Sequence, residues 1–385
     1  MNDHDPTSTR TSGARRSATR TVLFAGGGTG GHIYPNVGIL EALRARRPDV
    51  SVRFLVSNRP GDDKIMERLG EAFTASPVRP LPTLRRPWEA LPFARAWQQG
   101  TAQLRALIRE HDIAVVVATG GFVSGPAITE AASAGLPRAM VNLDAVPGSA
   151  NRLLVRRCSR VFTAYRSSRL PGAVAIGLPL RTASVGSPDP AAARTALGLD
   201  PARPLLFVTG ATHGATSVIH ALEALVRRPA IVDALQGFQL LHQCGTYDVP
   251  GLQATYDACG VRAKVVDYLD AMGQAWAAAD LAVSRAGAGS VAEAWANATP
   301  TVFLPNPYHR DQHQRHNAQP MADGGGAVMI SDEIDPERNA DLLVPVLLEL
   351  LGDRRRREGM RTAARRTCPP DGAAAVAAWI DEALG

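Results

Sequence analysis

The chain has 385 residues, of which 45% are hydrophobic, 20% are charged and 5% are aromatic, and its formal net charge is +6. This length allows two domains with separate cores, and the composition is ordinary for a globular protein. The basic balance fits anionic partners such as nucleotides, nucleic acid or acidic lipid, without choosing among them.

Several classes of protein are disfavoured at once. The four cysteines are scattered without C-x-x-C spacing, which argues against a zinc site and against a disulfide framework. Residues 1–20 are rich in Ser, Thr and Arg and lack an apolar centre, so they predict a disordered basic tail and not a signal peptide. No later stretch reaches the roughly 18 apolar residues that a spanning helix needs. A reducing cytoplasm is the simplest location.

In chain order, apolar strands alternate with helical segments, which is typical of a parallel α/β sheet. A turn-rich stretch at residues 177–190 separates two such series, and each series opens with a strand and a glycine-rich loop. We therefore predict two Rossmann-like domains facing across a cleft, at residues 21–182 and 190–371, with a last helix at 372–385 that could pack back on the first. The expected strands are residues 21–25, 52–56, 113–118, 138–142, 160–164, 174–176, 204–209, 238–242, 263–266, 281–284 and 301–304.

The first glycine loop, residues 26–31, joins a strand to a helix and is followed by His32 and Pro35. Bare N–H groups and a helix start suit a phosphate or diphosphate. A plain NAD site is doubtful, because the next strand leads into Ser57, Asn58 and Arg59 and has no acidic residue at its end. A P-loop is also excluded, because Gly31 is followed by His32 and Ile33 and not by Lys and Ser or Thr. The alternative is a glycine turn that only packs strand on helix.

A second glycine motif, residues 284–293, follows another buried strand. Gly287, Gly289 and Ser290 predict a second phosphate-binding helix start. Glu293, one turn into that helix, offers two acceptor oxygens that match the vicinal hydroxyls of a ribose. Alternatively, Glu293 is an ordinary glutamate that the helix dipole favours.

The loop at residues 305–318 gathers amides, histidines and a carboxylate after a strand. Such groups suit a hydroxyl-rich ligand such as a sugar, although a polar surface loop has the same composition. His309, His313 and His316 have near-helical spacing, which raises the question of zinc. Without a cysteine or a carboxylate triad around an open position, we predict no metal.

Five motifs together resemble the MurG glycosyltransferases. They are residues 27–35, 119–126, 145–152, 242–245, and 286–293 with 311–318. The resemblance implies a GT-B fold and transfer of GlcNAc from UDP-GlcNAc to undecaprenyl-diphospho-muramoyl-pentapeptide, a step of peptidoglycan synthesis. It also implies a cytoplasmic enzyme, peripheral on the inner face of the cell membrane, that uses no cofactor and binds no nucleic acid.

The resemblance also assigns site residues by position. The acceptor diphosphate would contact Gly28, Thr29, Gly30, Gly31, Gly121 and Ser124. The donor UDP-GlcNAc would contact Thr29, Asn151, Arg181, Thr212, His213, Gly214, Leu269, Ala288, Gly289, Ser290, Glu293, His313 and Gln314. Within this set Leu269 would frame the uracil, Glu293 the ribose, and His313 with Gln314 the GlcNAc hydroxyls.

The reaction would be an inverting displacement, for which a base must take the proton of the acceptor hydroxyl. His32 is the candidate, since a histidine titrates near physiological pH, although it could instead orient a phosphate. One departure matters: where the family typically carries His-Glu-Gln-Asn, residues 141–144 read Val-Asn-Leu-Asp. Asn142 cannot act as a base, whereas Asp144 could, so this departure concerns the acceptor side and leaves the UDP-sugar side largely intact.

Residues 78–97 mix Trp and Phe with arginines and prolines, which suits docking on an anionic bilayer as well as an ordinary surface loop. Other functions remain open. They are a related transferase with another lipid or saccharide acceptor, an NADP oxidoreductase using residues 26–31 with Arg59, and a non-catalytic UDP-sugar-binding module.

Overall fold

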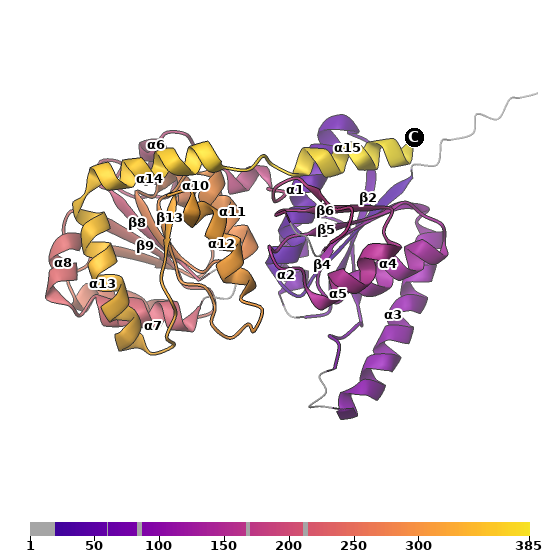
Figure 1. Cartoon of the computed structure of the whole chain (residues 1–385), viewed down its shortest axis with the longest axis horizontal. Coiled ribbons are helices and arrows are strands. Elements are labelled where there is room, and N and C mark those ends of the chain that lie inside the picture. Colours follow the sequence, from indigo (N-terminus) through magenta and orange to yellow (C-terminus); the bar gives the residue numbers. More distant parts are fainter. Residues whose placement is uncertain (1–19, 60, 83–86, 167–169, 211–214) are drawn as a thin grey trace, which may run out of the picture.

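The computed structural model describes residues 20–59, 61–82, 87–166, 170–210 and 215–385. In Figure 1 two halves lie side by side along the long axis, and each half holds one sheet between layers of helices. This arrangement confirms the predicted α/β fold with two parallel-sheet units.

The first sheet comprises β1 (Thr21–Gly26), β2 (Ser51–Ser57), β3 (Phe73–Ser76), β4 (Ile113–Gly120), β5 (Arg138–Asn142), β6 (Arg160–Thr163) and β7 (Val174–Ala175). Its strands follow the order β3-β2-β1-β4-β5-β6-β7, and all neighbours are parallel. The helical elements of this half are α1 (Gly30–Arg46), α2 (Asp62–Leu69), η1 (Pro87–Glu89), α3 (Ala90–Glu110), α4 (Ser124–Ser133), α5 (Ser149–Leu154) and η2 (Val155–Arg157).

The second sheet comprises β8 (Leu205–Thr209), β9 (Gln239–Gln243), β10 (Ala263–Val266), β11 (Leu281–Ser284), β12 (Thr301–Phe303) and β13 (Ala327–Met329). Its order is β10-β9-β8-β11-β12-β13, again with all neighbours parallel. The remaining helical elements are η3 (Thr182–Ser184), α6 (Pro190–Ala196), α7 (Thr216–Leu225), α8 (Pro229–Leu235), α9 (Val249–Ala258), α10 (Met272–Ala278), α11 (Ala288–Ala296), α12 (His313–Asp323), α13 (Pro336–Gly352), α14 (Arg354–Thr367) and α15 (Ala373–Leu384).

Burial explains which strands the sequence reveals. Every residue of β1 is buried between β2 and β4, and a parallel strand with helices on both faces shows as a continuous apolar run. The edge strands β3 and β13 were not predicted. Strand β3 is a short run that is mostly half-buried or exposed, and β13 has only three residues, which follow the glycines at 324–326.

Helix α15 crosses back onto the first half, where it covers α1 (Figure 1). Val376 and Ile380 are fully buried in the core of the first sheet. At the helix end, Asp381 pairs with Arg46 at 2.9 Å and also with Arg47. The chain therefore crosses between the two halves twice, and its last helix packs on the first half.

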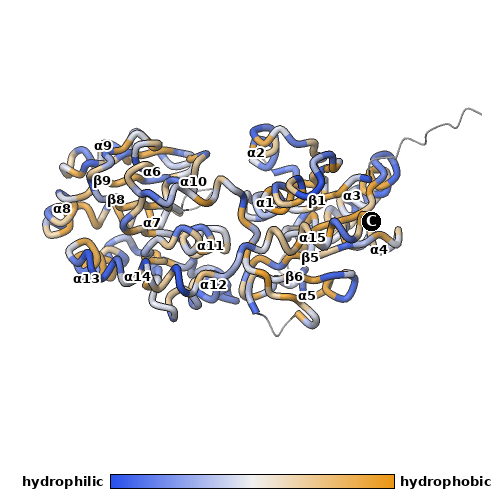
Figure 2. The backbone as a smooth tube through the Cα atoms, turned by 90° about the horizontal axis from the view of Figure 1, so that it is seen from above, coloured by the Kyte–Doolittle hydropathy of each residue, from blue (hydrophilic) through white to orange (hydrophobic). Residues whose placement is uncertain are grey.

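Figure 2 shows hydrophobic stretches running through the inside of both halves, whereas α14 is largely hydrophilic. No helix in the described part of the chain is both long enough and apolar enough to cross a membrane.

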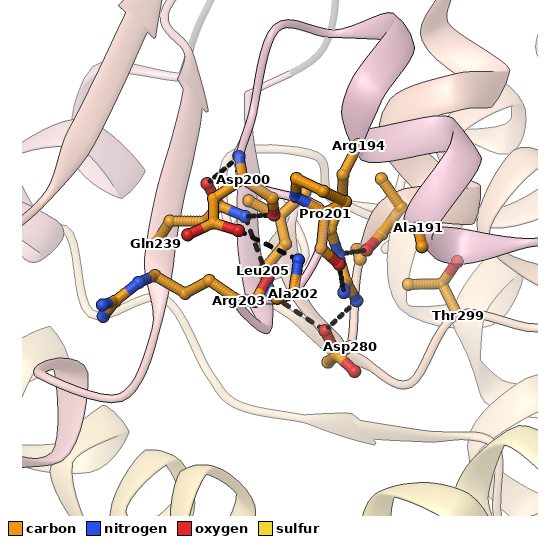
Figure 3. Close-up of polar contacts among 12 residues, drawn as sticks. Ala191, Arg194, Asp200, Pro201, Ala202, Arg203, Leu205, Gln239, Asp280 and Thr299 are labelled. Atoms are coloured by element: carbon orange, nitrogen blue, oxygen red, sulfur yellow. Dashed lines mark hydrogen bonds and ion pairs between the residues drawn. The ribbon is translucent and has the colours of Figure 1, made fainter.

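A buried polar network lies at the amino ends of β8 and β11, away from the turn that leads into α11 (Figure 3). The guanidinium of Arg194 pairs with Asp280 at 2.6 Å and donates to the carbonyl oxygens of Ala278 and Pro201 at 3.1 and 3.0 Å. Asp280 also accepts from the N–H of Leu205 at 2.8 Å. Both side chains of this ion pair have further partners, so the network fixes α6 against the amino ends of these strands.

Candidate active site

A cavity of about 340 Å³ lies between the two halves, at the carboxyl ends of their strands. The helix starts of α1 and α11 both reach it, one from each half. Ligands of open parallel sheets bind outside the carboxyl ends of the strands, so this cavity is the candidate active site. The predicted site residues that line it are Thr29, Gly30, Gly31, His32, Asp144, Arg181, Leu269, Ala288, Gly289, Ser290, Glu293 and Gln314.

Other predicted residues lie elsewhere. Gly28, Gly121, Ser124, Asn151 and His313 are not part of the cavity wall. Thr212, His213 and Gly214 lie outside the described residues.

The first two glycines of the turn after β1 are required for packing. A Cβ on Gly26 would lie 2.4 Å from the carbonyl oxygen of His32, and a Cβ on Gly27 would lie 2.5 Å from the backbone nitrogen of Ser57. Backbone atoms cannot move aside as a flexible side chain can, so neither position has room for a larger residue. The alternative interpretation of this turn, as a packing device, is therefore correct for these two positions.

A carboxylate of the protein occupies the inner side of the same turn. Asp62, at the start of α2 and only 3% exposed, accepts from the N–H of Gly28 at 2.6 Å. It also accepts from the N–H of Ser57 at 3.2 Å and from its hydroxyl at 2.7 Å. The N–H of Gly28 is therefore already bonded, and only the later part of the turn, Thr29 to Gly31, faces the cavity.

The loop after β4 supports this turn. Gly120 has a φ of +125°, and a Cβ there would lie 2.7 Å from the ring of His32, while a Cβ on Gly121 would lie 2.2 Å from the carbonyl oxygen of Gly27. The buried hydroxyl of Ser124 donates to the carbonyl oxygen of Gly120 at 2.8 Å and accepts from its N–H at 3.1 Å. The predicted contact of Ser124 with a diphosphate therefore has no geometric support, because the hydroxyl is used inside the loop.

His32 lies in the first turn of α1 and faces the cavity, with Nδ1 3.5 Å from the hydroxyl oxygen of Thr29. Burial lowers the pKa of His32 below its ordinary value, and the charges of Asp144 and Asp62 partly oppose that effect. The imidazole is therefore neutral at physiological pH. A neutral imidazole can accept a proton, which is the property a general base needs.

The loop after β5 presents one carboxylate to the cavity. Asn142 is buried, and its amide donates to the carbonyl oxygen of Asp144 at 2.7 Å and to the hydroxyl of Thr163 at 3.2 Å. Asn151 of α5 donates to Asn142 Oδ1 at 3.0 Å, so part of its amide is used in a bond to the end of β5, and its predicted contact with the donor stays a prediction. These amides fix the backbone from which Asp144 reaches the cavity.

Asn317 of α12 was not predicted as a site residue, yet it bonds to this loop from the other half. Its Nδ2 donates to Asp144 Oδ1 at 2.9 Å, and its Oδ1 accepts from the N–H of Ala145 at 2.8 Å. Its position one helical turn after His313 and its polar character were the available signals. Sequence alone did not reveal that this amide would be fully buried between the two halves.

The turn into α11 is open. A Cβ on Gly287 or Gly289 would meet no atom within 4 Å, and no side chain caps the helix. The first N–H groups of a helix have no partner within it, and together with the helix dipole they favour an anion. Because Gly287, Gly289 and Ser290 line the cavity, this helix start can bind a phosphate or diphosphate there.

Glu293 lies one turn further along α11, at the cavity wall beside Leu269 and Met272. Its carboxylate accepts from the hydroxyl of Ser184 at 2.8 Å and from the indole N–H of Trp276 at 3.0 Å. Burial raises the pKa of Glu293, while these two hydrogen bonds and the charge of Arg181 oppose the rise. The carboxylate is thus held in a fixed orientation with the apolar residues as its neighbours.

Two tyrosines and two arginines join the halves at one side of the cavity. The hydroxyls of Tyr34 in α1 and Tyr268 after β10 lie 2.7 Å apart. The guanidinium of Arg181 lies 4.1 Å from the ring centre of Tyr34, and that of Arg68 lies 4.4 Å from the ring centre of Tyr268. Arg181 lines the cavity, and its Nε is buried without a partner among the described residues.

The polar loop before α12 is only partly in the cavity. Gln314 lines it, and its Oε1 accepts from the N–H of Asn306 at 2.9 Å, which orients the amide. His313 instead bonds Asp311 at 2.9 Å, and its ring centre lies 4.4 Å from that of His309. The ligand atoms of His309, Asp311 and His313 lie within 4.8 Å of one another, so this group is where a metal ion could bind in the described part of the chain.

Two family models match the chain. The glycosyltransferase family 28 N-terminal domain matches residues 22–163, and the glycosyltransferase family 28 C-terminal domain matches residues 205–374. A Nocardioides protein named "UDP-N-acetylglucosamine--N-acetylmuramyl-(pentapeptide) pyrophosphoryl-undecaprenol N-acetylglucosamine transferase" is 37% identical over 357 residues, which is 91% of this chain and 94% of that protein. A protein of the same name from Chlorobaculum tepidum is 34% identical over 371 residues, covering 93% and 98%.

Solved structures show the same architecture. The MurG of Acinetobacter baumannii matches with a TM-score of 0.70 at 22% identity, over 94% of this chain and 99% of that one. The calicheamicin glycosyltransferase CalG4 matches with a TM-score of 0.62 at 14% identity, over 95% and 98%. At these identities the likeness establishes the fold, which is the two-domain fold of these transferases.

Proposed function

This chain belongs to glycosyltransferase family 28, and we propose that it transfers GlcNAc from UDP-GlcNAc to undecaprenyl-diphospho-muramoyl-pentapeptide. Relatives that carry this activity in their names match nearly the whole chain. The observation that carries the proposal is the cavity between the halves, where an open helix start and an oriented carboxylate, Glu293, face a histidine of the other half.

We assign the donor to the second half, residues 190–371. The diphosphate of UDP would accept from the N–H groups at the start of α11, and the positive charge of Arg181, which lines the same cavity, would favour the anion. The uracil would lie against Leu269, and the ribose hydroxyls would donate to Glu293. Gln314 is placed for the GlcNAc hydroxyls, whereas His313 would have to leave Asp311 to reach them.

We assign the acceptor to the first half, residues 21–182 with the helix at 372–385. Its diphosphate would lie at the cavity side of the first turn, where Thr29, Gly30 and Gly31 are exposed to it. Asp62 fills the inner side of that turn, so the acceptor phosphates would be held by this outer rim.

The chemistry is an inverting displacement at the anomeric carbon. The acceptor oxygen forms its bond to that carbon as the bond to UDP breaks, and the electron pair leaves with UDP. Neutral His32 takes the acceptor proton, and the amides and dipole of α11 stabilise the departing diphosphate. Because the pKa of His32 is lowered, kcat/KM should rise with pH along a limb centred below about 6.5, the ordinary histidine value.

We further propose that the chain binds the inner face of the cell membrane through the stretch predicted above, residues 78–97, of which 78–82 and 87–97 are described. Trp88, Leu91 and Leu81 are 70%, 60% and 59% exposed, and Arg79 and Arg95 are exposed near them in sequence. In Figure 1 the start of α3 projects from the body of the first half. Exposed aromatic and aliphatic side chains with arginines suit an anionic surface that holds a lipid acceptor.

Vesicle binding tests this surface. Co-sedimentation with phosphatidylglycerol-containing vesicles should weaken by about tenfold or more in Trp88→Ala/Leu91→Ala, since each side chain contributes about 1–2 kcal/mol when buried. Leu342→Ala removes an exposed leucine of α13 in the other half and should bind as wild type does. Equal binding of all three proteins would contradict the membrane assignment.

The catalytic test is transfer of labelled GlcNAc to a short-chain analogue of the lipid-linked muramoyl-pentapeptide, with and without EDTA. Transfer should be insensitive to EDTA and should fall about a hundredfold or more in His32→Ala and Glu293→Ala. His316→Ala, an exposed histidine of α12, is the matched control and should keep full activity. Absence of transfer by the wild type would exclude this acceptor.

A different lipid- or saccharide-linked acceptor is the second candidate, and the loop after β5 favours it. Asn142 stands where the resemblance places a glutamate, and its amide donates hydrogen bonds to Asp144 and Thr163 within the first half. Hydrolysis or binding of UDP-GlcNAc without transfer to the pentapeptide acceptor would select this candidate.

A further inference from the structure

Among the described residues of α12, Asn317 is the one whose side chain bonds the loop after β5, and both ends of its amide are used. The N–H of Ala145 must face an oxygen, so Oδ1 accepts there at 2.8 Å and Nδ2 is directed to Asp144 Oδ1 at 2.9 Å. Nδ2 also lies 3.4 Å from the carbonyl oxygen of Ala286. The amide is completely buried, so this orientation is fixed.

Asp144 has one oxygen committed and one available. Among the described residues, Asp144 Oδ2 accepts no hydrogen bond, and the side chain lines the cavity together with His32. The titratable groups that sense the charge of Asp144 are His32 of α1, Tyr165 after β6 and His309 before α12. Burial raises the pKa of Tyr165, so this phenol stays neutral and His32 is the partner inside the cavity.

The other carboxylate near His32 lies outside the cavity. Asp62 of α2 accepts three hydrogen bonds, all on Oδ2, from the N–H of Gly28 and from the N–H and hydroxyl of Ser57, which hold it on the inner side of the turn. Of these two carboxylates, Asp144 is the one that lines the cavity together with His32.

We propose that Asn317 is a positioning residue by which the donor half completes the acid–base pair of the acceptor half: it holds Asp144 towards His32 only when the two halves are together. The inference rests on the proposed function, since it gives His32 the proton of the acceptor hydroxyl. As the new glycosidic bond forms and UDP leaves with its electron pair, the proton moves to His32 and Asp144 balances the new charge. Proton removal is thus linked to closure over the donor.

Steady-state kinetics of Asn317→Ala, Asp144→Asn and the double variant test this. Asn317→Ala should lower kcat by about tenfold or more with the KM for UDP-GlcNAc within about threefold of wild type. If Asn317 acts through Asp144, the double variant should be no slower than Asp144→Asn alone. Gln319→Ala removes an amide of α12 that bonds only Asp323, and it should match wild type in every measurement.

A second readout does not depend on the acceptor. The charge of Asp144 raises the pKa of His32, so a misplaced carboxylate should let that pKa fall. NMR titration of the His32 ring, which needs no acceptor, should therefore show a lower pKa in Asn317→Ala and in Asp144→Asn. In the transfer assay, the acidic limb of kcat/KM should move to lower pH by the same amount. Thermal unfolding and UDP affinity of each variant show that it is folded.

The outcomes separate the two claims. If the wild type transfers no GlcNAc to this acceptor, but the pKa of His32 is lower in Asn317→Ala, the proposed acceptor is wrong and the positioning role stands. An active wild type with an unchanged His32 titration in Asn317→Ala would overturn the positioning role. A raised KM for UDP-GlcNAc with an unchanged pH profile, or losses that multiply in the double variant, would instead make Asn317 a donor ligand.

Discussion

The turn after β1 and the turn after β11 both lead a buried parallel strand into a helix that begins at the cavity. In the first turn, Gly26 and Gly27 are packed against backbone, and Asp62 bonds the N–H of Gly28. In the second turn, the space around Gly287 and Gly289 is open and the helix start is uncapped. Similar glycine patterns thus serve two purposes.

The difference follows from where the negative charge comes from. In the first half the protein supplies its own carboxylate, Asp62, which bonds the N–H of Gly28. The inner part of this turn therefore has a structural role, and the ring of His32 packs against Gly120 beside it. In the second half no protein anion occupies the helix start among the described residues, so a ligand anion can be bound there. We therefore propose that the first half positions the base, with the acceptor diphosphate at the outer rim of its turn, and that the second half holds the diphosphate of UDP.

Gly27→Ala and Gly289→Ala separate these purposes most strongly. A Cβ at Gly27 meets backbone at 2.5 Å, so Gly27→Ala should lower the free energy of unfolding by about 3 kcal/mol or more. Gly289→Ala should leave stability equal or raise it by up to about 1 kcal/mol, because alanine is the better helix former. It should nevertheless weaken UDP binding by about tenfold, since the methyl group fills ligand space.

Denaturant unfolding and calorimetric titration with UDP measure both quantities. Equal destabilisation by the two substitutions would show that the two turns are equivalent and would contradict their separate purposes.

Asp62→Ala tests the role of the carboxylate that occupies the first turn. It leaves the N–H groups of Gly28 and Ser57 without their acceptor, which should cost about 2–4 kcal/mol of stability. Because the turn that leads to His32 loses this support, kcat should fall while UDP affinity stays near wild type. Asp63→Ala is the matched control, since Asp63 is exposed and bonds only the local N–H groups of Gly61 and Lys64.

An Asp62→Ala protein as stable as Asp63→Ala would mean that the carboxylate does not support the turn.

Tyr268→Phe and Tyr34→Phe give the smallest expected effect. Each removes the hydrogen bond between the halves at 2.7 Å and keeps the ring that faces an arginine. This hydrogen bond should stabilise the contact between the halves by about 1 kcal/mol, so its loss should raise the KM for UDP-GlcNAc about threefold to fivefold. Because both variants remove the same bond, the double variant should equal either single one; multiplied effects would show two independent roles.

Much of the fold was readable from the sequence because both sheets are buried on both faces. The runs at 21–25 and 281–284 contain only residues that a buried parallel strand accepts. The edge strands β3 and β13 lack that constraint, so their composition carries no comparable signal. The cavity residues of the second half could also be found from the sequence, since Gly289, Ser290 and Glu293 lie within one short segment that α11 brings to the cavity.

The acceptor side depended on contacts between distant segments. Asp62 and Gly28 are 34 residues apart, and Asn317 and Asp144 are 173 apart, so neither pair could be derived from local pattern. The sequence also did not reveal that Ser124 and Asn151, at the starts of α4 and α5, would hydrogen-bond to the ends of β4 and β5. Spacing predicts a helix start well and predicts its long-range partners poorly.

The most direct test of the division between the halves is calorimetric titration of UDP into wild type, Glu293→Ala and His32→Ala, because it needs no acceptor. We predict that Glu293→Ala weakens UDP binding by about tenfold or more, whereas His32→Ala binds UDP within about twofold of wild type despite losing transfer. Retained UDP affinity in Glu293→Ala, or lost affinity in His32→Ala, would contradict the assignment of the UDP ribose to Glu293 and of the base to His32.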